Sequence, residues 1–149
     1  MHSRQIPPFL PPWKNIVPAF WIVFLAWVAL LVYASSQPGK TGPDHPVIYI
    51  DKIEHFLFFA SGAMSFGAAI RATFPIRWST LFLVVIVSFG MFGLADEIHQ
   101  MFVTGRSGGD PFDWLADLTG TCCGLAFLRT FYAKRPRENP GAAEADREA

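Results

Sequence analysis

Four apolar segments of membrane-spanning length dominate this sequence and limit what it can fold into. The first covers residues 16–34, a run of 19 residues that is broken only by Pro18 near its start. As a helix it is roughly 28 Å long, close to the thickness of the hydrocarbon core of a bilayer. The others cover residues 53–70, 78–102 and 114–131. We therefore expect an all-α membrane protein with four transmembrane helices in an antiparallel bundle.

The composition agrees with a membrane protein. The chain is 52% hydrophobic and 16% charged, whereas about 25% of residues are charged in a typical soluble domain. Phe (15 residues) and Trp (5 residues) dominate the aromatic content, as suits a membrane body with interfacial anchors. The formal net charge of zero gives no reason to expect nucleic acid as a partner. Cys122 and Cys123 are adjacent in an apolar run, which favours small packing residues over a disulfide.

The segments before and after the four spans have different compositions. Residues 1–15 are rich in proline, which predicts an interfacial segment and no helix. Residues 134–149 lack apolar periodicity and are predicted to be a disordered tail. Residues 16–133 then form the transmembrane domain. The alternative for the first span is a signal peptide, but its apolar stretch exceeds the usual 7–15 residues.

The distribution of Lys and Arg predicts the orientation of the spans. If the amino terminus is inside, nine of these residues lie on the inner side and three on the outer side, namely Lys40, Lys52 and Arg106. The positive-inside rule therefore predicts that both termini are cytoplasmic.

Ionisable and polar residues gather at one end of each of the last three spans. Three clusters result: Asp51, Lys52, Glu54 and His55; Asp96, Glu97, His99 and Gln100; Arg106, Asp110, Asp113 and Asp117. With alternating spans, all three clusters lie at the outer surface. Charged groups at the edge of hydrocarbon usually pair with each other and mark a site.

Helical spacing predicts how the clusters meet. Two stripes have small residues deep in the membrane and polar residues at the mouth: Gly90, Gly93, Glu97 and Gln100 on the third span, and Asp113, Asp117, Gly120 and Gly124 on the fourth. Small residues let helix backbones approach closely, so we expect spans three and four to pack together. Span two is the expected third wall, through Lys52, His55, Phe59 and Gly62.

The charges of these clusters do not balance. Seven carboxylates face only Lys52 and Arg106. Near lipid, some carboxyl groups must bind a proton or a cation. Arg106 is the best partner for a carboxylate within the chain, because its planar guanidinium group can bind one carboxylate and donate a hydrogen bond to another. We expect Asp117, the deepest carboxylate, to pair with Arg106 or to be protonated.

These residues resemble the VanZ-like family. The similarity comprises D-K-x-x-H-F from Asp51 to Phe56, D-E-x-x-Q-x-F from Asp96 to Phe102, and then Arg106, Asp113 and Gly120. The family's usual Asn is replaced by Asp117. The resemblance implies a small multi-helix membrane protein, in a family named for a member that raises teicoplanin resistance, with no established reaction.

The expected function is recognition of a polar headgroup, a cell-wall lipid intermediate or a glycopeptide-like amphiphile. The expected ligand-binding residues are Asp51, Lys52, His55, Asp96, Glu97, Gln100, Arg106, Asp113 and Asp117. One alternative is a membrane enzyme that uses His55 and Glu97 as acid and base. Another is that the polar residues only lock helix ends together. A metal site is the weaker reading, since there is no H-E-x-x-H pair. We expect no cofactor, and the sequence leaves the oligomeric state open.

Overall fold

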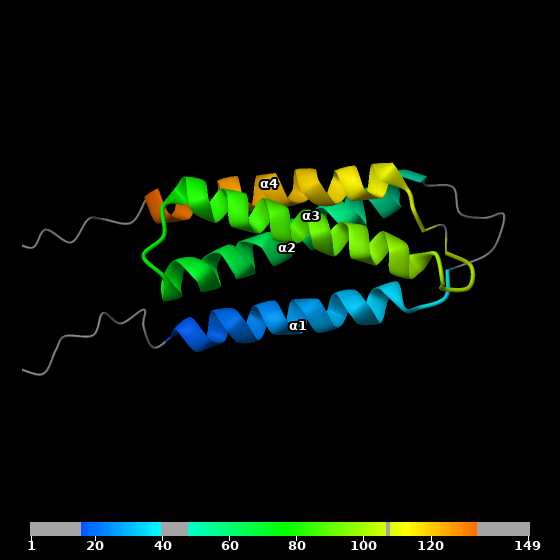
Figure 1. Cartoon of the computed structure of the whole chain (residues 1–149), viewed down its shortest axis with the longest axis horizontal. Helices are drawn as coiled ribbons and strands as arrows, with labels where there is room; N and C mark the ends of the chain where they lie inside the picture. Colours follow the sequence, from blue (N-terminus) through cyan, green and yellow to red (C-terminus); the bar gives the residue numbers. More distant parts are fainter. Residues whose placement is uncertain (1–15, 40–47, 107, 134–149) are drawn as a thin grey trace, which may run out of the picture.

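The computed structural model describes residues 16–39, 48–106 and 108–133, and within these ranges it contains helices and no strand. The four helices are α1 (Val17–Ser35), α2 (Ile48–Thr73), α3 (Trp78–Gln100) and α4 (Pro111–Ala133). Consecutive helices run in opposite directions along an elongated bundle (Figure 1). The predicted all-α fold is confirmed. The predictions for residues 1–15 and 134–149 concern residues outside the described part.

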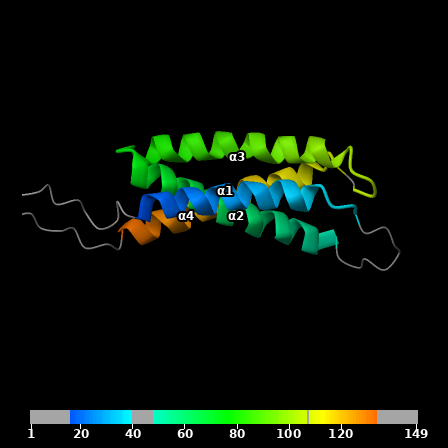
Figure 2. The same cartoon turned by 90° about the horizontal axis from the view of Figure 1, so that it is seen from below.

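Three of the helices are long and apolar enough to cross a membrane. They are α1, α2 from Ile50 onward, and α3, and they run along one another in both views (Figures 1 and 2). The fourth, α4, equals α3 in length, at 23 residues, but it carries carboxylates in its first two turns. The described part of the chain is thus all-helical, and its three apolar helices indicate a multi-pass membrane protein.

The glycines of α4 pack against α2. A Cβ atom added to Gly120 would overlap the carbonyl oxygen of Phe56, and one added to Gly124 would overlap that of Ala60. The prediction that these glycines face the third span is therefore wrong. Glycines let backbones approach closely, and here they lie against α2 at Phe56 and Ala60, beyond its first two turns.

Helix α3 contacts α4 through a neighbouring face. An added Cβ at Gly93 would lie 2.7 Å from Asp117 Oδ2, and one at Gly90 would lie 3.4 Å from Leu118. The expected packing of the third and fourth spans is thus present. It places the Asp117 carboxylate against the backbone of α3.

Helix α1 joins the bundle through aromatic rings. Phe24 and Trp27 are buried, and Trp27 stacks on Phe58 with ring centroids 5.0 Å apart. The Trp27 indole donates a hydrogen bond to the Phe58 carbonyl oxygen (2.9 Å), and its ring occupies the space beside Gly62. Gly62 therefore packs against α1, whereas the predicted stripe on the second span directed it toward the third and fourth spans.

Candidate functional site

The predicted polar clusters meet at one end of the bundle, where α1 and α3 end and α2 and α4 begin (Figure 1). Helix α2 starts five residues earlier than the predicted span, so the first cluster lies within its opening turns. Several polar side chains at this end are buried: Ser35, Asp96, Glu97, Gln100, Asp113 and Asp117. Buried polar groups require partners, and these side chains form three connected networks.

Lys52 joins α2 to the start of α4. Its ammonium group donates to Asp110 Oδ2 at 2.6 Å and also to Asp113. The hydrogen bond from Lys52 lowers the pKa of Asp110, which lies in the loop before α4. The Asp113 side chain is only 5% exposed. Lys52 thus neutralises a carboxylate that has little access to water.

His55 is the partner of the deepest carboxylate. Its Nδ1 lies 2.9 Å from Asp117 Oδ1, and Asp117 is fully buried. Of the two alternatives predicted for Asp117, the pairing with Arg106 is therefore wrong. Asp117 faces α3 and α2 in the middle of the bundle end, whereas Arg106 lies beside α1.

Arg106 caps the end of α1. Its Nη2 donates to the Ala34 carbonyl oxygen at 2.7 Å, and its Nε donates to the Gln37 carbonyl oxygen at 3.2 Å. The last carbonyls of a helix have no partners within the helix, and an Arg side chain can satisfy them. Arg106 was expected to hold a carboxylate bidentately, and instead it fixes the loop after α3 to α1.

The two adjacent carboxylates of α3 are anchored in different ways. Asp96 accepts hydrogen bonds from Gln100 Nε2 (2.7 Å) and from the Ser35 hydroxyl. One oxygen of Glu97 accepts from the backbone N–H groups of Gly109 and Asp110, each at 2.8 Å. These bonds hold the α3–α4 loop against the end of α3.

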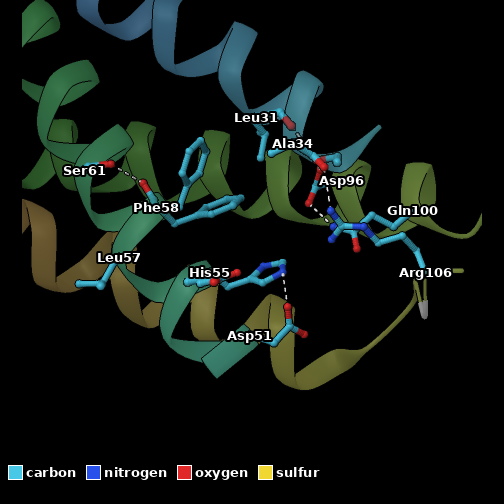
Figure 3. Close-up of a pocket in the computed structure, with 13 residues that line it drawn as sticks. Leu31, Ala34, Asp51, His55, Leu57, Phe58, Ser61, Asp96, Gln100 and Arg106 are labelled. Atoms are coloured by element: carbon cyan, nitrogen blue, oxygen red, sulfur yellow. Dashed lines mark hydrogen bonds and ion pairs between the residues drawn. The ribbon is translucent and has the colours of Figure 1, made fainter. Parts of the chain in front are cut away.

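A pocket of about 490 Å³ opens between α1, α2 and the end of α3 (Figure 3). Its lining includes five of the nine predicted ligand-binding residues: Asp51, His55, Asp96, Gln100 and Arg106. The other four, Lys52, Glu97, Asp113 and Asp117, are not in the lining. Of the predicted acid–base pair, His55 lines the pocket and Glu97 does not, although their ligand atoms lie within 4.8 Å of each other.

Helix α1 contributes a wall that the sequence reading missed. Leu31, Ala34 and Ser35 line the pocket from α1. Ser35 directly follows the first apolar segment, which was predicted to end at residue 34. A hydroxyl one residue past an apolar span was the only signal that could have indicated it.

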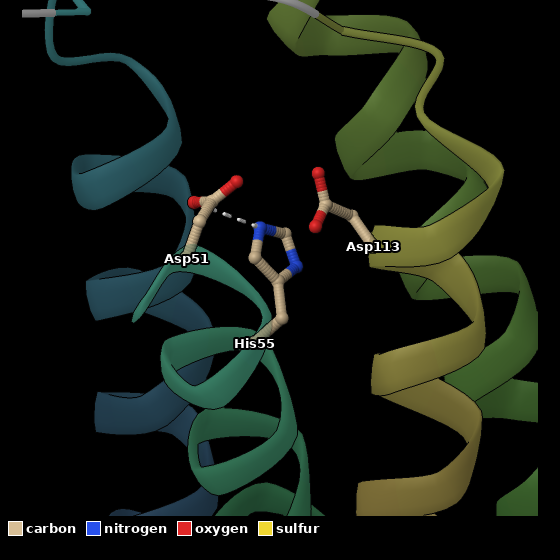
Figure 4. Close-up of side chains that lie close together, drawn as sticks. All are labelled: Asp51, His55 and Asp113. Atoms are coloured by element: carbon tan, nitrogen blue, oxygen red, sulfur yellow. Dashed lines mark ion pairs between the residues drawn. The ribbon is translucent and has the colours of Figure 1, made fainter. Parts of the chain in front are cut away.

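His55 connects the pocket with the buried carboxylates. Its Nε2 lies 4.0 Å from Asp51 Oδ1, on the side opposite the Asp117 contact. Figure 4 shows the imidazole between Asp51 and Asp113. Among the described residues, two sets of side chains have ligand atoms within 4.8 Å of one another, and both include His55: Asp51, His55 and Asp113; and His55, Asp96 and Glu97.

Fold and composition thus define the class, a helical multi-pass membrane protein with a pocket of mixed apolar and charged lining at one end. In comparisons with protein-family models, curated proteins and solved structures, nothing matches this chain.

Proposed function

We propose that this chain is a VanZ-like protein of the bacterial cytoplasmic membrane that binds the headgroup of an amphiphile in its pocket. The observation that carries the proposal is the amphipathic lining of the pocket. Leu31, Leu57 and Phe58 line it alongside the charged Asp51 and Arg106. Sites for small molecules are typically apolar cavities with a few converging polar groups.

The charged residues define the headgroup chemistry. The carboxylates of Asp51 and Asp96 can accept hydrogen bonds from hydroxyl or ammonium groups of a headgroup. Arg106 donates one N–H to Ala34 in α1 and another to Gln37 just after α1, and its remaining donors suit a phosphate or carboxylate. A headgroup that combines an anionic group with hydroxyls or amines, such as that of a cell-wall lipid intermediate, matches this set. Glycopeptide-like amphiphiles share the same groups.

We further propose that α4 crosses the membrane beside α2. Helix α4 lies along α2 from the Lys52–Asp113 contact to Gly67, where an added Cβ would lie 2.9 Å from Leu128. A helix that follows a membrane span over this length covers the same depth. Both termini are then cytoplasmic, with nine Lys and Arg residues inside and three outside. The pocket opens at the outer leaflet.

Cysteine labelling tests this orientation. In a background with Cys122 and Cys123 replaced by alanine, Ser36→Cys places a thiol at the pocket end and Ser79→Cys places one at the opposite end. Both serines are exposed. We expect a membrane-impermeant maleimide to label Ser36→Cys in intact cells and to label Ser79→Cys only after permeabilisation. The reverse pattern would place the pocket on the cytoplasmic side.

A variant that fills the pocket tests amphiphile binding. Ser61 is exposed and lines the pocket, so Ser61→Trp should occupy the pocket and leave the buried networks intact. We expect native mass spectrometry of the full chain to show one bound polyprenyl diphosphate-linked disaccharide pentapeptide, with at least tenfold weaker binding to Ser61→Trp. Ser79→Trp is the matched control and should bind like the wild type. Equal binding to all three proteins, or a phosphatidylglycerol that binds equally well, would contradict the proposal.

A further inference from the structure

We propose that His55, Asp96 and Glu97 bind one divalent transition-metal ion, and that Asp117 orients the imidazole. The three side chains each offer a ligand atom, and these atoms lie within 4.8 Å of one another. Ligands about 2.1 Å from a common ion are at most about 4.2 Å apart. Small side-chain rotations would therefore complete the site. This site shares Asp96 and His55 with the lining of the pocket proposed above to bind an amphiphile, and the two proposals are tested separately.

An unpartnered buried oxygen indicates that Glu97 has a missing partner. Glu97 is 4% exposed, and its Oε1 is buried without a hydrogen-bond partner. The other oxygen, Oε2, is fixed by the Gly109 and Asp110 amides. A buried acceptor without a partner is costly, more so when it carries charge. The carboxylate is thus held rigidly with one oxygen available to a ligand that carries positive charge.

The hydrogen bond of His55 prepares it as a ligand. When Nδ1 donates its proton to Asp117 Oδ1 at 2.9 Å, Nε2 carries the lone pair. Metal-bound histidines almost always donate their other ring N–H to a carboxylate or a carbonyl group in this way. Asp117 is fully buried, so it fixes the ring orientation while it remains outside the set of ligands.

The charges at this position favour a divalent cation. Asp96, Glu97 and Asp117 are each less than 10% exposed. Lys52 contacts Asp110 and Asp113, and Arg106 contacts backbone carbonyls, so both basic side chains are used elsewhere. If His55 were the only cationic partner of these three carboxylates, negative charge would remain in excess. A divalent ion would offset it.

The second set, Asp51, His55 and Asp113 (Figure 4), fits a cation less well. Asp113 already receives the ammonium group of Lys52, which would repel a metal ion. Asp51 has a side chain that is 48% exposed. The chosen set combines one imidazole with two carboxylates, a mixture that suits Zn²⁺ or Mn²⁺.

Metal analysis of the full chain tests the proposal. The protein is purified in mild detergent, stripped with a chelator, incubated with Zn²⁺ or Mn²⁺ alone, and passed through gel filtration before elemental mass spectrometry. We expect one ion per wild-type chain. Glu97→Gln and His55→Gln should each weaken binding at least 100-fold. Asp117→Asn, which keeps all three ligands, should weaken it roughly 10- to 100-fold.

Asp113→Asn is the matched control for Asp117→Asn, because both remove a buried carboxylate from the same end of α4. It should bind the ion like the wild type. Loss of the ion in Asp113→Asn but not in Glu97→Gln would overturn the proposal in favour of the second set. Absence of a bound ion in the wild type would overturn it outright. A variant with an altered gel-filtration profile is set aside. The test is then the electron paramagnetic resonance spectrum of Mn²⁺ added to the wild-type protein. A spectrum of free Mn²⁺ alone would refute the site. Ser61→Trp should lose the amphiphile and retain the ion. Failure of the amphiphile proposal can therefore be distinguished from failure of the metal proposal.

Discussion

Replacing Gly124 by alanine should destabilise the bundle by about 1–3 kcal/mol, even though alanine is the better helix former. The added methyl group would overlap the carbonyl oxygen of Ala60 on α2. A backbone atom cannot rotate away as a side chain can, so α2 and α4 must separate. Thermal or denaturant unfolding in detergent would measure the loss.

Gly90→Ala provides the control for this prediction. Its methyl group would meet Leu118 at 3.4 Å, an ordinary van der Waals contact with the end of a flexible side chain. We expect Gly90→Ala to be neutral or to stabilise by up to about 1 kcal/mol through helix propensity. Equal effects of the two substitutions would show that Gly124 does not fix the α2–α4 distance.

Replacing Lys52 by methionine should destabilise the protein by about 1–3 kcal/mol, because it removes one partner of an ion pair that is only partly exposed to water. Methionine keeps the length of the side chain but leaves Asp113, whose side chain is 5% exposed, without its cation. The same loss frees the loop residue Asp110. Unfolding measured by circular dichroism at neutral pH would give the difference.

A second substitution separates charge from packing. In the Lys52→Met background, Asp113→Asn removes the unpaired charge, and we expect it to restore most of the lost stability. The two substitutions should therefore be strongly non-additive, as expected for residues in direct contact. Simple additivity would contradict the assigned pair.

The helices could be predicted well because their signal is local. The spans starting at residues 16 and 78 were predicted within two residues at each end, since apolar runs of fixed length identify them. Helix α2 starts at Ile48, ahead of the predicted residue 53. Its first turns contain the charged cluster, so hydropathy alone could not show that they are helical.

The convergence of the polar clusters was also predictable, because alternating helix direction places them at one end. The pairing within them was not. Asp117 contacts His55, and Arg106 caps α1. Which carboxylate faces which cation depends on the rotation of each helix about its axis, and a periodic stripe leaves that rotation open.

The amino-acid sequence by itself determined the helical class, the number of helices and the end of the bundle where charge accumulates, because these follow from the length and order of apolar segments. Only the tertiary structure decided that α2 receives the glycines of α4, that α1 completes the pocket, and that His55 rather than Arg106 meets the buried Asp117. These outcomes depend on contacts between helices, which steric fit and hydrogen-bond geometry select among many arrangements that share the same hydropathy pattern.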